Sequence, residues 1–166
     1  MISIRKVKIG TPAGSPVIPQ FKPVKQPLFH FSQKVDYGLF LMIELAKSAS
    51  TQAISLRLIS QKHQLSFFFL QKIANNLRKA GLIQAERGKN GGYALKKSTK
   101  NITLKEVLEA LEGPIAVMHC LAHGPETQSC VRESWCSMKS GLNSINQVII
   151  NALTQTTLDR LLPHHA

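Results

Sequence analysis

Three cysteines gather in one short stretch of the chain, "CLAHGPETQSCVRESWC", which covers residues 120 to 136. Cys120, Cys130 and Cys136 are all the cysteines that the 166-residue chain has. Three thiolates can hold three corners of an iron-sulphur cluster, and a fourth ligand must then come from elsewhere in the protein. Because this spacing is looser than that of a CxxC chelate, the pattern alone leaves the chemistry of the stretch open.

Two other kinds of chemistry fit the same stretch. With His123, the three cysteines would make a tetrahedral zinc set of three thiolates and one imidazole, and His119 lies nearby as a spare ligand. Without any metal, a free thiolate beside Arg132 or His123 would be open to reversible oxidation. A disulfide framework would leave one of the three cysteines unpaired, which favours a reducing, cytoplasmic location.

The charge of the chain indicates a polyanionic partner. Lys and Arg number 21 against 9 Asp and Glu, a formal net charge of +12, and nucleic acid is the first candidate partner for so basic a protein. No apolar run approaches the roughly 20 residues that cross a bilayer, and the N-terminal residues do not resemble a secretory signal. We therefore expect a soluble cytoplasmic protein without a membrane partner. An enzyme is the least expected class, because no nucleophile-base pair, paired carboxylates or phosphate loop stands out.

Four segments are expected along the chain. Residues 1–31 hold five of the eight prolines and five basic residues without an acid, which predicts a disordered basic arm. Residues 32–113 are expected to form the DNA-binding domain, 114–137 the cysteine loop, and 138–162 a long amphipathic helix with a C-terminal segment. The apolar stripe of this helix predicts a partner helix, most simply from a second copy of the chain. It consists of Leu142, Ile145, Ile149, Ala152 and Leu153.

Three helices are predicted before a hairpin in residues 32–113. Ser32, Ser55 and Ser66 each stand where a side-chain oxygen can cap the start of a helix. The first helix is expected to bury the apolar residues Val35, Leu39, Met42, Ile43 and Ala46. The third is expected to bury Phe69 or Leu70, Ile73, Leu77 and Ala80, with Gly81 as its C-terminal cap.

After the third helix the apolar pattern changes to a period of two. "LIQAER" and "YAL" predict two short strands, and "GKNGG" between them supplies a basic, glycine-rich turn. Thr103 and Glu106 then make a capping box for a fourth helix, which Gly113 and Pro114 end. The expected fold class is mainly α with a small β-hairpin: a winged helix-turn-helix domain followed by a long C-terminal dimerisation helix.

Six residues are expected to contact DNA in such a domain, because its third helix enters the major groove while the wing lies along the flanking backbone. They are Ser66, Phe68, Gln71 and Lys72 on the helix, and Arg87 and Lys89 on the wing. Gln71 can pair with an adenine edge, and Lys72 with guanine or a phosphate. The alternative is that "FFF" is simply core and the basic residues a solvated face, in a winged helix that binds protein while the loop holds structural zinc.

The run "SLRLISQKHQLSFFFLQKIANNLRKAGLIQAERGKNGGYAL", with "ITLKEVLEALEG" after it, resembles the Rrf-type winged-helix transcription regulators. This family includes the iron-sulphur regulator IscR and the nitric-oxide sensor NsrR, and the likeness covers about residues 32–162. The resemblance implies a homodimer on a pseudo-palindromic DNA operator, with the C-terminal helices as the interface. It also implies that Cys120, Cys130 and Cys136 hold a two-iron or four-iron cluster, which would sense nitric oxide, iron-sulphur or redox status.

The two branches of the resembled family differ in the fourth ligand. The iron-sulphur branch has a histidine three residues after the last cysteine, where this chain has Lys139. The nitric-oxide-sensing branch resembles "KVDYGLFL" and uses an aspartate that reaches the cluster of the other subunit, which implies Asp36 here. Taken by itself, Asp36 is an acid at a helix start that the helix dipole stabilises. The first spacer, between Cys120 and Cys130, is longer than the family's usual five residues.

Overall fold

The computed structural model describes residues 31–48, 53–88, 91–122 and 130–162. These residues all belong to one compact unit, Phe31–Ala166. The predicted basic arm, residues 1–31, lies outside the described residues except for Phe31. Of the helices that are described, none combines the length and apolar character needed to cross a membrane.

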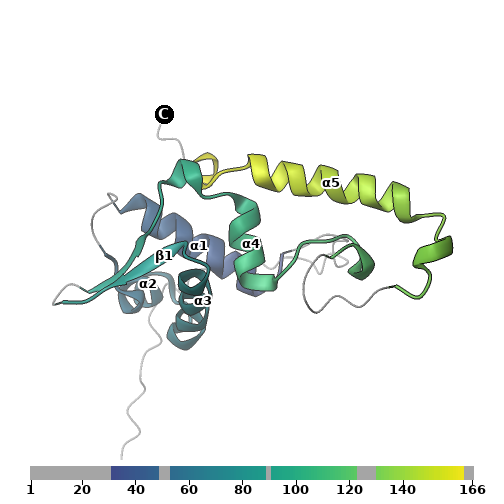
Figure 1. Cartoon of the computed structure of the whole chain (residues 1–166). Helices are drawn as coiled ribbons and strands as arrows, with labels where there is room; N and C mark the ends of the chain where they lie inside the picture. The colour runs from purple at the N-terminus through teal and green to yellow at the C-terminus, as the bar shows by residue number, and fades with distance from the viewer. Residues whose placement is uncertain (1–30, 49–52, 89–90, 123–129, 163–166) are drawn as a thin grey trace, which may run out of the picture. The chain divides into compact units, whose positions relative to one another are not determined.

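Three helices form the helix-turn-helix part of the fold: α1 (Gln33–Lys47), α2 (Leu56–His63) and α3 (Phe67–Lys79) (Figure 1). Each begins at the serine that the sequence predicts. The side-chain oxygens of the three serines accept hydrogen bonds from the backbone N–H groups of Val35, Arg57 and Phe69, respectively. These caps satisfy N–H groups that a helix start otherwise leaves without a partner.

The predicted hairpin is present as β1 (Ile83–Glu86) and β2 (Gly92–Leu95), antiparallel, with Ile83 opposite Leu95. Ile54, just before α2, exchanges two backbone hydrogen bonds with Tyr93, both of 2.9 Å. Gly92 permits this approach, since a Cβ atom there would collide with the Ile54 carbonyl. The wing is therefore fixed to the start of the helix-turn-helix.

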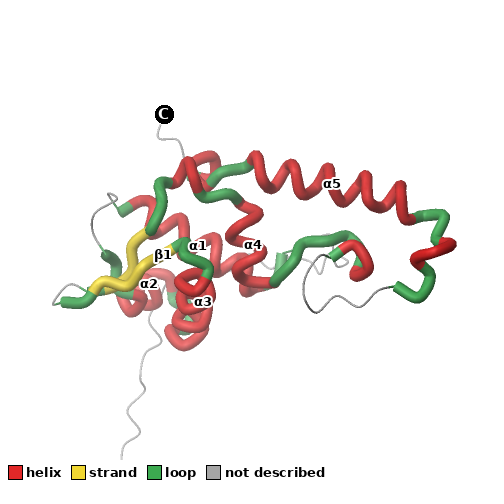
Figure 2. The backbone as a smooth tube through the Cα atoms, in the orientation of Figure 1, coloured by secondary structure: helices red, strands yellow, loops and turns green. Residues whose placement is uncertain are grey.

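Two further helices complete the described fold. The predicted capping box begins α4 (Leu104–Glu112): Glu106 N donates to Thr103 Oγ1 at 3.1 Å, and Thr103 N donates to Glu106 Oε2 at 2.9 Å. After the cysteine loop comes α5 (Lys139–Gln155). Figure 2 shows a mainly helical fold with one small hairpin. The expected fold class is therefore confirmed.

The core lies between α1, α3, α4 and the hairpin. Leu70, Ile73 and Leu77 are fully buried on α3, as predicted, but Ala80 is exposed. That prediction is wrong because Ala80 is the last residue before the chain turns away through Gly81, at φ +73°, and leaves the stripe. Ala74, one position beyond Ile73, is buried instead.

On α1, Val35 and Met42 are buried as expected, whereas the other three predicted residues are half-buried. Leu41 and Leu45 are fully or almost fully buried, although the predicted stripe did not include them. The reason is that α1 packs against both α3 and α4, so it buries a wider face than one stripe of residues.

A buried carboxylate joins α1 to the end of α2. Glu44 is only 6% exposed, and its oxygens lie 3.0 Å from Lys47 Nζ, 3.0 Å from Lys62 Nζ and 3.2 Å from His63 Nε2. Burial alone would raise the pKa of Glu44, but the hydrogen bonds from Lys47, Lys62 and His63 outweigh it and lower the pKa to about 2.

Replacing Glu44 should therefore destabilise the domain in a pH-dependent way. Because the pKa of Glu44 falls from 4.5 to about 2 on folding, its contribution is present above about pH 4.5 and is lost as the pH falls toward 2. We expect Glu44→Gln to lower the free energy of unfolding at pH 7 by about 1–3 kcal/mol. Urea unfolding at several pH values measures this difference.

Glu109→Gln is the matched control, because Glu109 makes a more exposed ion pair with Lys105 and such pairs contribute little. The difference between wild type and Glu44→Gln should shrink toward pH 2. An equal difference at pH 7 and pH 2.5 would contradict the electrostatic role of Glu44.

Candidate functional site

One face of α3 is exposed along its whole length. Phe68, Gln71 and Lys72 lie on it, followed by Asn75 and Lys79 at the same helical spacing. The buried stripe occupies the opposite face. Four of the six residues predicted to contact DNA are thus exposed at or near the start of α3, since Ser66 caps this helix and is exposed too. The extension of the face to Asn75 and Lys79 was missed, although the same spacing indicates it.

The three consecutive phenylalanines have three different surroundings. The Phe69 ring packs edge-on against Tyr37, with 5.4 Å between the ring centroids. Phe67 is half-buried, and the guanidinium carbon of Arg57 lies 5.5 Å from the centre of its ring. Phe68 is 75% exposed. The alternative that "FFF" is simply core is therefore wrong for Phe68.

The wing contributes the other predicted DNA contacts. Arg87 follows β1 directly and is exposed. The next residue, Gly88, has φ +138°, a conformation that glycine adopts without strain. Lys89 lies outside the described residues. Arg87 on the wing and Lys72 on α3 are thus two exposed cationic side chains on separate elements of the helix-turn-helix.

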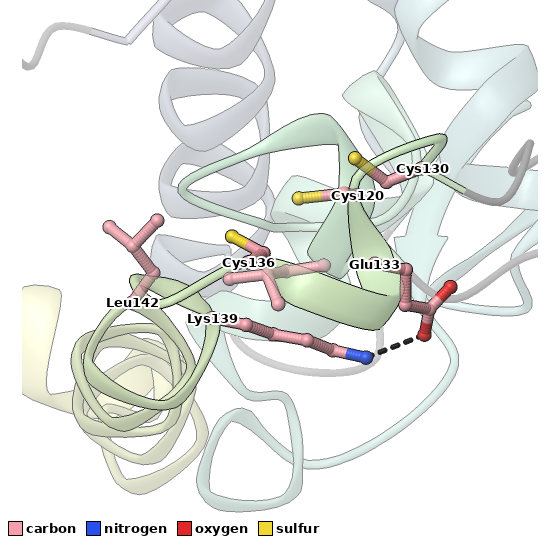
Figure 3. A pocket seen from close by; sticks show the side chains of 7 residues that line it. Cys120, Cys130, Glu133, Cys136, Lys139 and Leu142 are labelled. Carbon is pink, nitrogen blue, oxygen red and sulfur yellow. Dashed lines mark hydrogen bonds and ion pairs between the residues drawn. The ribbon is translucent and has the colours of Figure 1, made fainter.

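The three cysteines line one small pocket, which Figure 3 shows from close by. Cys120 lies in the short turn His119–Leu121, while Cys130 and Cys136 lie on either side of the turn Glu133–Trp135. Two apolar residues, Leu121 and Leu142, line the pocket as well. Residues 123–129, which include His123, lie outside the described residues.

A lysine and a glutamate line the same pocket as the thiols. The Lys139 ammonium, at the start of α5, donates a 2.5 Å hydrogen bond to Glu133 Oε1 (Figure 3). This bond raises the pKa of Lys139, and the nearby Cys120 and Cys136 act in the same direction. It also lowers the pKa of Glu133. From the sequence, Lys139 was noted only because it stands where the iron-sulphur branch has a histidine ligand. Its ion pair with Glu133 was not predicted.

The two kinds of metal site predicted for the thiols place different demands on the arrangement of their ligands. Within the described residues, no three His, Cys, Asp or Glu side chains are grouped so that they could hold one metal ion. Zinc needs its ligands at about 2.0–2.3 Å from one centre, whereas a cluster spreads its cysteine ligands over several iron atoms. Asp36 is exposed in the first turn of α1, and it is not one of the residues that line the cysteine pocket.

Comparison with known proteins gives a family and several relatives. The family model Rrf2, described as an iron-dependent transcriptional regulator, matches residues 31–164. The transcriptional regulator CymR of Bacillus subtilis is 35% identical over 130 residues, 78% of this chain and 87% of its own length. NsrR of Halalkalibacterium halodurans is 30% identical over 127 residues, 76% of this chain and 86% of its own length.

Solved structures with the same fold belong to differently named regulators. CymR, described as the global cysteine regulator of B. subtilis, has a TM-score of 0.64 and 32% identity, and the match covers 84% of this chain and all of that one. The IscR of T. potens has a TM-score of 0.61 and 26% identity, over 80% of this chain and 85% of that one. The fold is common to these proteins, whereas their names indicate different signals.

A positive charge on the exposed face of α3 should increase DNA affinity mainly by contacting phosphates. We expect Lys72→Ala to weaken binding to a random-sequence duplex and to reduce the slope of log affinity against log salt by about 0.9, because one counterion fewer is released. Fluorescence anisotropy at several salt concentrations measures the slope.

Lys105→Ala is the matched control: it removes the same charge from α4, where Lys105 Nζ lies 2.8 Å from Glu109. Its slope should equal that of the wild type. Equal slopes for all three proteins would remove Lys72 from the DNA contacts.

Proposed function

The chain belongs to the Rrf2 family of DNA-binding transcriptional regulators, and we propose that it is a cytoplasmic homodimer whose operator affinity depends on an iron-sulphur cluster in the cysteine pocket. Membership of this family of regulators confirms the predicted DNA-binding function and the expectation that the chain is not an enzyme. The cluster, its signal and the dimer are the proposed part.

The observation that carries the proposal is the pocket itself. Cys120, Cys130 and Cys136 are spread over 17 residues, yet all three line one pocket next to the start of α5. Soft thiolates are the usual protein ligands of iron-sulphur clusters. In the proposed site these three cysteines hold the cluster together with Asp36 of the partner subunit. When bound, the cluster would supply an iron whose carboxylate ligand binds more weakly than the thiolates and would be open to displacement by nitric oxide or oxidants.

The exposed apolar side chains of α5 support the homodimer. Ile145 and Val148 are exposed on this helix, while Leu142 and Ile149 are half-buried. The same face on a second copy would cover them in a two-fold symmetric interface. Two recognition helices related in this way match a pseudo-palindromic operator.

Residues of the chain itself connect the pocket to the DNA-binding face. At the end of α5, the Thr156 carbonyl accepts a 2.7 Å hydrogen bond from Leu104 N, at the start of α4. Helices α1, α3 and α4 pack against one another. A change at the pocket would thus be passed along α5 to the helices that support α3, and would alter the spacing of two recognition helices.

A second candidate function is a thiol-based regulator without a metal. The observation that favours it is that Lys139 lines the same pocket as the three cysteines, since cationic residues are typical of the surroundings of reactive cysteines. In this case oxidation of a thiol, rather than damage to a cluster, would change operator affinity.

Anaerobic purification of the full chain, followed by an absorption spectrum and analysis for iron, sulphide and zinc, tests the cluster. We expect a coloured protein that contains iron and sulphide, and we expect Cys120→Ser to lose most of the colour because one of three thiolate ligands is gone. Ser137→Ala, beside Cys136 and outside the pocket lining, is the control and should keep the colour.

Colourless protein with stoichiometric zinc would overturn the cluster in favour of the structural-zinc alternative. Colourless protein with neither metal, whose DNA affinity changes with a mild oxidant, would favour the thiol-based regulator. Both outcomes leave the DNA-binding function in place.

The fourth ligand has a test of its own. If Asp36 of the partner subunit binds the cluster, Asp36→Ala should shift the visible spectrum and change the rate at which a nitric-oxide donor bleaches it, because a ligand has been exchanged. Gln33→Ala changes a second exposed residue in the first turn of α1 and should alter neither. An unchanged spectrum and an unchanged bleaching rate in Asp36→Ala, with normal thermal unfolding, would exclude Asp36 as a ligand.

A further inference from the structure

Phe68 is an exposed aromatic side chain on the helix that meets DNA. Its exposure of 75% contrasts with the packing of Phe67 and Phe69 on either side of it in the sequence. A phenylalanine ring in contact with water is unfavourable, so any partner that covers it gains free energy. The position of Phe68 in the first turn of α3, two residues after the Ser66 cap, puts the ring where recognition helices contact base edges.

The ring of Phe68 contacts one neighbouring ring. Phe67 packs against it edge-on, with 5.9 Å between the ring centroids and an angle of 66° between the planes. Phe67 is in turn packed against the core and lies under the Arg57 guanidinium of α2. Contact with a packed neighbour restricts the Phe68 ring, which reduces the conformational entropy lost when a partner covers it.

The charge around Phe68 indicates what that partner is. Gln71 and Lys72 follow at i+3 and i+4, so they lie on the same exposed face of α3. These three side chains are complementary to the major groove. The cation matches phosphates, the amide matches polar base edges, and the apolar ring matches an apolar group on one of the bases. That apolar group is the methyl group of thymine, which distinguishes A·T from the other base pairs.

We propose that Phe68 reads the methyl group of a thymine in each operator half-site and so determines part of the base specificity. The proposal deepens the DNA-binding function of the family and does not depend on the cluster. The role proposed for Phe68 is separate from that of Lys72, whose ammonium is predicted to contact phosphate or guanine.

The experiment begins with duplexes selected from a random pool by the full-length protein. Each thymine of a selected duplex is then replaced singly by deoxyuridine, which removes the methyl group and keeps the base pairing. We expect one position in each half-site at which this change lowers the affinity of the wild type about fourfold, the value of one buried methyl-sized group. At that position the affinity of Phe68→Ala should be the same for both bases.

Two further variants separate base reading from structural damage. Phe68→Leu keeps an apolar side chain and should retain part of the preference for thymine. Leu58→Ala is the matched control, because Leu58 is an exposed apolar residue of the same domain, 61% exposed, that lies on α2; it should keep the full preference. The salt dependence of Phe68→Ala should equal that of the wild type, since no phosphate contact is lost.

An identical loss at the same thymine in wild type and Phe68→Ala would overturn the proposal, as would a selected duplex in which no thymine is sensitive to the change. A failure to select any duplex would overturn it together with the DNA-binding function. The metal analysis bears on the cluster alone, so failure of the cluster proposal is distinguishable from failure of base reading.

Discussion

The burial of one face of α3 against α1 and α4 is the packing constraint on which the DNA-binding surface depends. Leu70, Ile73 and Leu77 are fully buried, and a helix with one buried stripe has only one rotational setting. The outward direction of Phe68 follows from that setting, as does the direction of the residues one turn later. Gly38 favours the close contact of α1 with α4, because a Cβ atom there would force the Leu111 side chain to shift.

The same packing reaches the cysteine pocket through α5. This helix has 17 residues, about 25 Å in length, and its C-terminal end is joined to the start of α4 by backbone hydrogen bonds. Partway along it, Asn146 is 1% exposed and its Oδ1 accepts a 3.0 Å hydrogen bond from Val117 N. The segment that leads into the cysteine loop is thus attached to the helix that leads back to α4. Helix α5 and its hydrogen bonds therefore connect the pocket to the helices that support the face proposed to bind DNA.

The parts of the fold predicted from the sequence are those that depend on local interactions. The three serine caps, the capping box at Thr103 and the hairpin were predicted, since each rests on residues within a few positions of one another. The burial of Leu41 and Leu45 was missed because it depends on which helices pack together. The predicted burial of Ala80 was wrong because the chain turns away from the helix directly after it. In the site, the spacing of the cysteines indicated possible ligands, whereas the Glu133–Lys139 ion pair depends on the folded path of the loop. The role of Asp36 stays a prediction.

The two sites differ in what a single chain supplies. The exposed face of α3 proposed to bind DNA is fixed by the core of one subunit, whereas the segment that carries the cysteines has apolar side chains exposed to water, of which Trp135 is 71% exposed. Val131 and Met138 are exposed nearby in the sequence. Apolar surface of this kind is expected to be covered in an assembly. In the proposed homodimer, the partner subunit would both cover this surface and contribute Asp36. The state of such a cluster would then act on the arrangement of the two subunits, and hence on the distance between two recognition helices, without any need to unfold either one.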